Sequence, residues 1–317
     1  MRILVFGLGA LGTVYSCLLK EAGHTVTGFD RAPVIDKVRT DGVRVEGIWG
    51  EHHTRLDRLT TDIAELVKEE FDLVILTVKS FETEAAVKQI KNMIDDGAYL
   101  LLAQNGYGNY EAAVRYLPKD RIVLGRVIFG AETIEWGYSR VTVIADDVLL
   151  GSPAHAVDES VLARLGSDFS HAGIPTRACV EVMQYVWAKI IYNSALNPLG
   201  AILEVAYGQL AADENCRRIM DAVVEEIFVV LAAIGQPVPW PDAQAYLDAF
   251  YGEMIPPTAM HHASMLQDIK RGRRTEIDAL NGAVAALGET CGVDTPVNRT
   301  IISILKAKEA LSQRQFS

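Results

Sequence analysis

The chain has 317 residues, which is long enough for two domains of ordinary size. Hydrophobic residues make up 50% of the sequence, and the formal net charge is −11 at pH 7. This acidic balance argues against nucleic acid or an anionic membrane as a partner, because both attract basic surfaces. The four cysteines show no C-x-x-C spacing, which favours a reduced, cytoplasmic protein without a zinc site or a disulfide framework.

The first half of the chain alternates strand-like and helical patterns. Strands are expected near residues 2–6, 25–29, 73–78, 99–104 and 122–128. Helices are expected near residues 10–22, 81–94 and 109–116. This rhythm predicts a doubly wound parallel sheet of the Rossmann type. Residues 132–151 predict two short antiparallel strands joined at Gly137, and a helix (158–172) and a strand (174–178) follow.

The strand patterns end at about Glu181. Helical patterns follow near residues 181–196, 213–235, 241–253, 264–271, 277–291 and 297–313. Pro198 is predicted to end the first of these helices. The apolar run Ile227–Ile234 is too short to span a bilayer and is interpreted as the buried face of a helix. The sequence therefore predicts an α/β domain (residues 1–178) followed by an all-helical domain (179–317), with the substrate meeting a cofactor in the cleft between them.

A glycine motif, Gly7-x-Gly9-x-x-Gly12, directly follows the first strand and opens the first helix. In this context Gly7 permits a tight turn, Gly9 lets the backbone approach a pyrophosphate, and Gly12 allows close packing of helix and strand. The helix N-terminus offers unpaired N–H groups to the phosphates. The motif predicts dinucleotide binding, with a purely structural turn as the alternative.

Polar residues follow three more strands of the predicted sheet. Asp30 and Arg31 follow the second strand, Lys79 ends the third, and Asn105 ends the fourth. Ligands of open α/β sheets bind beyond the carboxyl ends of the strands, so these residues are candidate ligand contacts, with solvated side chains as the alternative. Asp30 favours NAD and Arg31 favours NADP, so these two residues alone leave the cofactor preference open.

A polar stripe interrupts the apolar helix near residues 181–196. Lys189, Asn193 and Asn197 stand at i, i+4 and i+8, so at helical pitch they line one narrow face. Burying an amine and two amides is unfavourable unless each finds a partner. The stripe therefore favours a functional face over a solvated one.

A second polar group lies near the C-terminus. Ser264 with Gln267 fits a capping box, and Thr275 is placed to cap a helix whose first turn carries Glu276 and Asp278. For Ser264, capping and ligand binding are both compatible with the pattern.

Together these residues resemble the ketopantoate reductase family, the NADPH-dependent 2-dehydropantoate 2-reductases. The resemblance spans the whole chain, and its more specific parts lie in the second half. It is carried by Gly7–Gly12 with Arg31, Val78–Ser80, Gln104–Gly106, Trp187–Lys189, Asn193 with Asn197–Leu199, Ser264–Asp268 and Thr275–Asp278.

The resemblance implies a role for each candidate residue. Lys189 would be the general acid that protonates the ketone oxygen, and Glu276 would bond the developing hydroxyl. The residues that would place the oxo acid are Asn105, Asn193, Asn197 and Ser264. The residues that would hold NADP(H) are Gly7, Leu8, Gly9, Ala10, Leu11, Gly12, Arg31, Lys79, Asn105, Ala131 and Glu276. No metal is implied.

Two positions depart from the family pattern. Tyr207 and His261 stand where the family tends to carry substrate-contacting Asn residues. The leading hypothesis is a reductase that converts 2-dehydropantoate to pantoate in pantothenate and coenzyme A synthesis. The alternatives are the same chemistry on another branched 2-oxo acid, and a non-catalytic NADP(H) sensor. The expected partner is a small oxo acid, and the apolar helical half could also form a homodimer surface.

Overall fold

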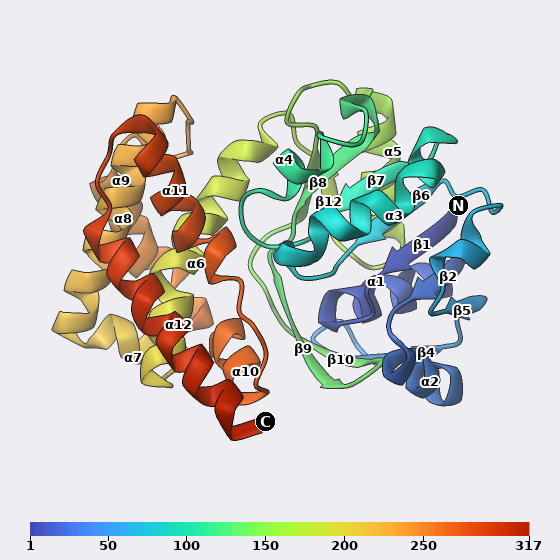
Figure 1. Cartoon of the computed structure of the whole chain (residues 1–317), viewed down its shortest axis with the longest axis horizontal. Helices are drawn as coiled ribbons and strands as arrows, with labels where there is room; N and C mark the ends of the chain where they lie inside the picture. The colour runs from blue at the N-terminus through green and yellow to red at the C-terminus, as the bar shows by residue number, and fades with distance from the viewer. Residues whose placement is uncertain (317) are drawn as a thin grey trace. The chain divides into compact units, whose positions relative to one another are not determined.

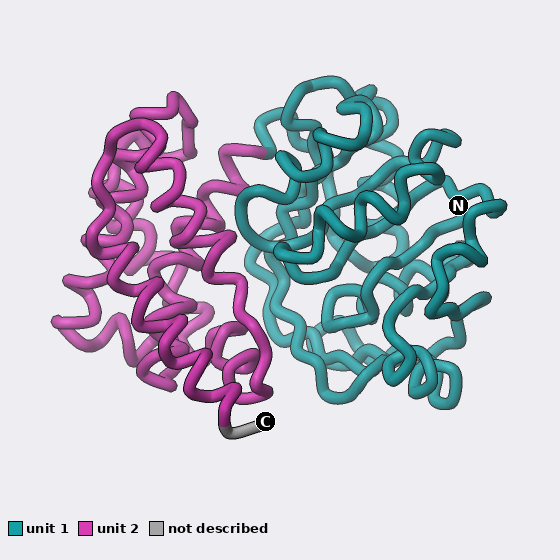
Figure 2. Tube along the Cα trace, in the orientation of Figure 1, with its two compact units in different colours: residues 1–182 teal, residues 183–317 magenta. Residues whose placement is uncertain are grey.

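We describe a computed structural model of the chain, which covers residues 1–316. The chain divides into two compact units, residues 1–182 and residues 183–317 (Figure 2).

The first unit is built on an eight-stranded sheet in the order β12-β11-β8-β7-β6-β1-β2-β5 (Figure 1). Neighbouring strands are parallel throughout, except that β11 runs antiparallel to β8. The strands are β1 (Arg2–Phe6), β2 (Thr25–Phe29), β5 (Arg58–Thr60), β6 (Leu73–Leu76), β7 (Tyr99–Leu102), β8 (Ile122–Arg126), β11 (Val148–Gly151) and β12 (Thr176–Ala178). The predicted doubly wound sheet is confirmed.

The central strands of this sheet are apolar along their whole length. Every residue of β6 is buried, as are Ile3, Leu4 and Val5 of β1. A parallel strand that is covered on both faces needs such a continuous apolar run instead of an alternating one. The helices of this unit are α1 (Ala10–Glu21), α2 (Ala32–Asp41), α3 (Thr83–Asp95), α4 (Asn109–Ala113) and α5 (Glu159–His171). Short 3-10 turns are found at Ile63–Leu66, Ser80–Glu82 and Lys119–Arg121.

A second sheet of four strands has the order β4-β3-β10-β9. Its strands are β3 (Val43–Gly47), β4 (His52–Thr54), β9 (Phe129–Glu135) and β10 (Tyr138–Ile144). The hairpin of β9 and β10 turns at Trp136 and Gly137, as the sequence predicted. Gly137 has φ +76°, and a Cβ there would lie 2.7 Å from Cγ2 of Val38, so the hairpin turn packs closely on α2.

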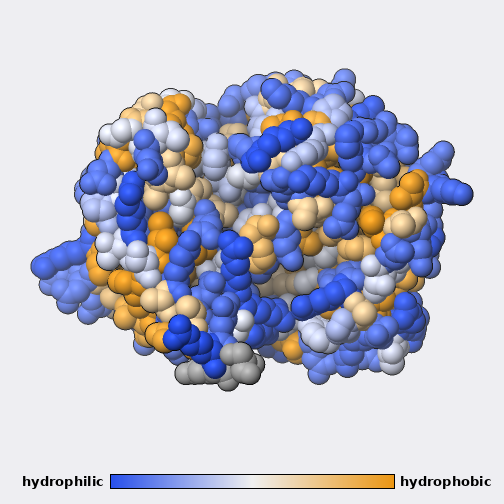
Figure 3. Space-filling view, in the orientation of Figure 1, coloured by the Kyte–Doolittle hydropathy of each residue, from blue (hydrophilic) through white to orange (hydrophobic). Residues whose placement is uncertain are grey.

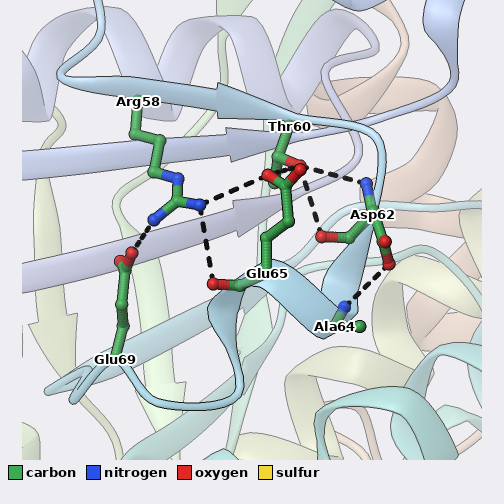
Figure 4. Close-up of polar contacts among 6 residues, drawn as sticks. All are labelled: Arg58, Thr60, Asp62, Ala64, Glu65 and Glu69. Atoms are coloured by element: carbon green, nitrogen blue, oxygen red, sulfur yellow. Dashed lines mark hydrogen bonds and ion pairs between the residues drawn. The ribbon is translucent and has the colours of Figure 1, made fainter.

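The edge strand β5 is held by a polar cluster in the loop that follows it (Figure 4). Arg58 pairs with Glu69 and, at 3.2 Å, with Glu65, whose carboxylate also accepts a hydrogen bond from the Thr60 hydroxyl at 2.8 Å. Asp62 caps the following 3-10 turn by accepting from the Ala64 amide at 2.9 Å. These side chains fold the loop back on a strand of only three residues, which a sheet edge tolerates.

The second unit is helical. It contains α6 (Val182–Leu203), α7 (Tyr207–Ala212), α8 (Glu214–Ile234), α9 (Ala243–Ala249), α10 (Ser264–Lys270), α11 (Asn281–Cys291) and α12 (Pro296–Phe316). A π-helical turn at Phe250–Met254 and 3-10 turns at Pro256–Thr258 and Ile277–Ala279 connect some of them. The predicted all-helical domain is confirmed.

The prediction that Pro198 ends the first of these helices is wrong, because α6 continues through it to Leu203. A proline inside a helix lacks the N–H that would bond the carbonyl four residues earlier, and typically destabilises the helix by about 3 kcal/mol. Here that carbonyl belongs to Ser194, and it accepts a hydrogen bond from Nδ2 of Asn281 at 3.1 Å. A partner from another helix therefore replaces the missing bond.

Hydrophilic residues cover most of the surface in view in Figure 3. The apolar run Ile227–Ile234 lies in α8, where Ile227, Val230 and Leu231 are buried. Across residues 1–316, no helix has both the length and the hydrophobicity that a membrane crossing requires.

Candidate cofactor and substrate sites

The four strand ends singled out in the sequence belong to four adjacent strands, in the order β7-β6-β1-β2. All three strand pairs are parallel, so their carboxyl ends lie at one edge of the sheet. Gly7 directly follows β1 and Asp30 directly follows β2, whereas Lys79 and Asn105 come shortly after β6 and β7. Chain order changes direction between β1 and β6, which is where open α/β sheets bind their ligands.

The glycine turn has the backbone features that a phosphate site needs. Gly7 has φ +100°, and a Cβ on Gly12 would lie 1.8 Å from the Gly7 carbonyl oxygen, so neither position accepts a side chain. A Cβ on Gly9 would meet no atom within 4 Å, which leaves open space above the turn. Helix α1 begins there with no side-chain cap and no acidic residue in its first turn. The turn and helix N-terminus therefore fit an anionic pyrophosphate.

Asp30 and Arg31, which favour different cofactors, make different contacts in the structure. The Asp30 carboxylate accepts hydrogen bonds from the backbone N–H of Leu8 at 2.6 Å and of Arg31 at 2.7 Å. Asp30 thus ties the end of β2 to the glycine turn. Arg31 is exposed at the start of α2, and its guanidinium carbon lies 5.8 Å from the ring centre of Trp136 in the hairpin turn.

Asn105 lies in a loop that is supported by a buried chain of hydrogen bonds. The Gln104 amide donates to the Thr83 hydroxyl at 2.7 Å, and this hydroxyl donates to Oδ1 of Asn109 at 2.7 Å. Nδ2 of Asn109 in turn donates to the Asn105 carbonyl at 3.0 Å. The sequence patterns missed Thr83 and Asn109, because isolated polar residues in a helix carry no motif.

The remaining candidates of the first unit lie on different elements. Lys79 is half-buried and precedes the 3-10 turn at Ser80–Glu82. Ala131 lies in β9, paired with Val141 of β10. Leu8, Ala10 and Leu11 belong to the glycine turn and the first turn of α1.

In the second unit, α6 carries all three residues of the polar stripe on continuous helix. Lys189 and Asn193 are half-buried, and Asn197 is 5% exposed. Oδ1 of Asn197 accepts a hydrogen bond from the hydroxyl of Tyr207. Nδ2 of Asn197 makes no hydrogen bond to any residue within 1–316, so this amide has donors to spare for a ligand.

The two positions that depart from the family pattern contact each other. The rings of Tyr207 and His261 are 5.4 Å apart, and the Tyr207 amide donates to the His261 carbonyl at 3.1 Å. Tyr192 packs edge-on against Tyr207, with ring centres 6.1 Å apart. Burial raises the pKa of the Tyr207 hydroxyl well above its usual value, so the group remains protonated and donates to Asn197.

Both capping predictions near the C-terminus are wrong. Ser264 is the first helical residue of α10 and is exposed, while the capping position belongs to Ala263, which has no side chain able to cap. Thr275 uses its amide and its hydroxyl to donate to the Glu309 carboxylate of α12, at 2.9 and 2.8 Å. Glu276 directly precedes the 3-10 turn at Ile277–Ala279 and is 8% exposed.

Two family models match the chain. The model described as "Ketopantoate reductase PanE/ApbA" matches residues 3–154, and the one described as "Ketopantoate reductase PanE/ApbA C terminal" matches residues 181–309. A 2-dehydropantoate 2-reductase of Aquifex aeolicus is 44% identical over 309 residues, which cover 98% of this chain and 97% of the relative. One from Pyrococcus horikoshii is 31% identical and covers 98% of both chains.

Solved structures show the same fold. A PanE/ApbA family ketopantoate reductase from Ralstonia eutropha superposes with a TM-score of 0.86 at 28% identity, covering 99% of this chain and 100% of the other. A D-mandelate dehydrogenase, solved with NADH and anilino(oxo)acetate, has a TM-score of 0.88 at 24% identity and covers 98% and 99% of the two chains. The matches extend through both units, and the chain belongs to the ketopantoate reductase family.

Proposed function

We propose that the protein is an NADPH-dependent 2-dehydropantoate 2-reductase, which reduces ketopantoate to pantoate in the synthesis of pantothenate and coenzyme A in the cytoplasm. The proposal is supported by full-length identity of 44% to a relative with that name. The observation that carries it within the structure is the polar face of α6, where Lys189, Asn193 and Asn197 follow one another at helical spacing.

In this proposal the first unit holds the cofactor, which supplies the hydride for the carbonyl carbon. The backbone amides at Gly9–Gly12 and the start of α1 bind the pyrophosphate. Arg31 binds the 2′-phosphate, because a guanidinium forms strong, charge-assisted hydrogen bonds to phosphate oxygens. Asp30 does not oppose this, since its carboxylate already accepts two backbone N–H groups. Lys79, Asn105 and Ala131 complete the set that the family resemblance assigns to the cofactor.

The second unit binds the oxo acid and supplies the proton. Lys189 donates a proton from Nζ to the ketone oxygen and stabilises the negative charge that develops on it. Asn193, Asn197 and Ser264 donate hydrogen bonds to oxygens of the substrate without adding charge. Glu276 accepts a hydrogen bond from the hydroxyl that forms.

Two other functions remain as alternatives. The pair Tyr207 and His261 favours a different branched or aryl 2-oxo acid, because aromatic rings stand where the family carries amides. A non-catalytic NADP(H) sensor would need no acid on α6, so Lys189 argues against it.

The test is a comparison of substrates with purified protein and NADPH. Ketopantoate, 2-oxoisovalerate and benzoylformate are compared by kcat/KM from the loss of nicotinamide absorbance. The proposal predicts that ketopantoate is preferred at least about tenfold over both, which corresponds to about 1.4 kcal/mol. A preference for either other acid would identify the first alternative, and NADPH binding without turnover of any acid would identify the sensor.

A further inference from the structure

Helix α6, which carries Lys189, Asn193 and Asn197, contains Pro198 and lacks one backbone hydrogen bond there. Pro198 has no N–H to donate to the Ser194 carbonyl. Ser194 directly follows Asn193, and Pro198 directly follows Asn197. The backbone hydrogen bond that Pro198 cannot make therefore lies in the turn of α6 that carries Asn193 and Asn197.

Asn281, the first residue of α11, donates to that carbonyl from Nδ2 at 3.1 Å. Both Ser194 and Asn281 have 0% exposed surface, so water does not compete for the bond. A buried carbonyl that loses its partner is strongly destabilised, and its local backbone shifts to find another. The Asn281 amide is thus a substitute for the missing helical N–H.

Asn281 is itself held in place by a chain of buried and part-buried hydrogen bonds. Its Nδ2 also donates to Oδ1 of Asn298 at 2.9 Å, and Nδ2 of Asn298 donates to the Glu226 carboxylate at 2.7 Å. The same carboxylate accepts from the backbone N–H of Val297 at 2.8 Å and of Asn298 at 3.0 Å, in the first turn of α12. The chain thus links α8, α11 and α12 to α6.

We propose that Asn281 is a positioning residue that replaces the backbone hydrogen bond lost at Pro198 and thereby fixes the turn of α6 that carries Asn193 and Asn197. Its effect on substrate rests on the proposed function. The residue acts through the backbone of α6, so its loss raises KM for the oxo acid and leaves the affinity for NADPH unchanged.

A double-mutant cycle tests the proposal. Asn281→Leu keeps the branching and the number of heavy atoms of the side chain but removes the donor, and Pro198→Ala restores the N–H that bonds Ser194 within the helix. In the Pro198 background, N281L raises KM for ketopantoate by about fivefold or more, the expected loss for a buried carbonyl left unpaired. In the P198A background, the same substitution changes KM by less than about twofold, because the carbonyl is already satisfied.

The control is Thr295→Val, a volume-matched change at another fully buried residue of the second unit, whose hydroxyl has no hydrogen-bond partner within residues 1–316. It keeps KM and Tm near those of the unmodified protein. An equal rise of KM in both backgrounds, or no rise in either, overturns the proposal. If N281L is insoluble, Asn281→Ser is compared in the same two backgrounds.

A different result is expected if the proposed function is wrong. In that case the unmodified protein does not reduce ketopantoate, and the melting temperatures of the four variants in the cycle decide the matter. The proposal then requires that N281L lowers Tm less in the P198A background than in the Pro198 background. Equal losses of Tm would contradict it.

Discussion

The Tyr207 hydroxyl donates a hydrogen bond to Oδ1 of Asn197, across a buried contact between α7 and α6. This hydrogen bond occupies the Oδ1 atom of Asn197 and leaves the two N–H groups of its Nδ2 atom as donors. In the proposed function, Tyr207 therefore acts on the oxo acid through Asn197, even though its ring replaces the amide expected from the family pattern.

Removing this hydroxyl tests its effect on Asn197. Tyr207→Phe keeps the ring contacts and loses one neutral hydrogen bond, worth about 0.5–1.5 kcal/mol. We expect KM for the oxo acid to rise about two- to tenfold, with unchanged affinity for NADPH. The matched control is Tyr192→Phe, which removes a hydroxyl that bonds Thr258 in the same aromatic cluster. An equal effect from the two variants would argue that the cluster matters only for packing.

The glycine turn predicts different effects on stability for two alanine substitutions. At Gly9 a Cβ meets nothing within 4 Å, so Gly9→Ala should fold with stability within about 0.5 kcal/mol of the unmodified protein. It should nevertheless weaken NADPH binding, since the methyl group enters the space for the pyrophosphate. Gly12→Ala should lose stability as well, because its Cβ would overlap the Gly7 carbonyl. Calorimetry measures the stability, and fluorescence titration measures the affinity for NADPH. Normal NADPH affinity in Gly9→Ala would contradict binding of the pyrophosphate at this turn.

The recognition of NADP over NAD is predicted to depend on Arg31. Loss of its charge-assisted hydrogen bonds, about 1.5–3 kcal/mol, should raise KM for NADPH about ten- to a hundredfold in Arg31→Ala. KM for NADH should change little, because NADH has no 2′-phosphate. Trp136→Ala should give a smaller rise for NADPH, about two- to fivefold, if the ring restrains the guanidinium. Arg39→Ala on the same helix, where the arginine pairs with Asp36, is the control. An equal rise of KM for NADPH and NADH would show that Arg31 does not recognise the 2′-phosphate.

The sequence predicted those parts of the fold whose signals are local. Continuous apolar runs such as β6 and the glycine turn after β1 determine strand, turn and helix within about ten residues. The short strands β3, β4 and β5 were missed, because three to five residues with polar or charged side chains leave no clear periodicity. Helix α2 was missed as well, since its buried residues are limited to Val34, Ile35 and Val38. Their positions depend on packing, as at Gly137 against Val38.

Two of the errors in the second unit share one physical cause. Pro198 is a helix breaker by local rules, and only the amide of Asn281, 83 residues further along the chain, allows α6 to continue. Thr275 likewise looks like a cap until Glu309 is brought next to it. In both cases a distant partner satisfies a polar group and overrides the local preference. Lys189, Asn193 and Asn197 were identified correctly as one face of a helix because i, i+4 spacing is itself local.

The most direct test of the central claim compares the unmodified protein with Lys189→Ala in the reduction of ketopantoate by NADPH. Because general acid catalysis contributes about 10²–10⁴-fold, we predict that kcat falls by at least about a hundredfold. The affinity for NADPH, measured by fluorescence titration, should remain near that of the unmodified protein. Turnover by Lys189→Ala at the unmodified rate would contradict the account, because the proton would then have to come from another group.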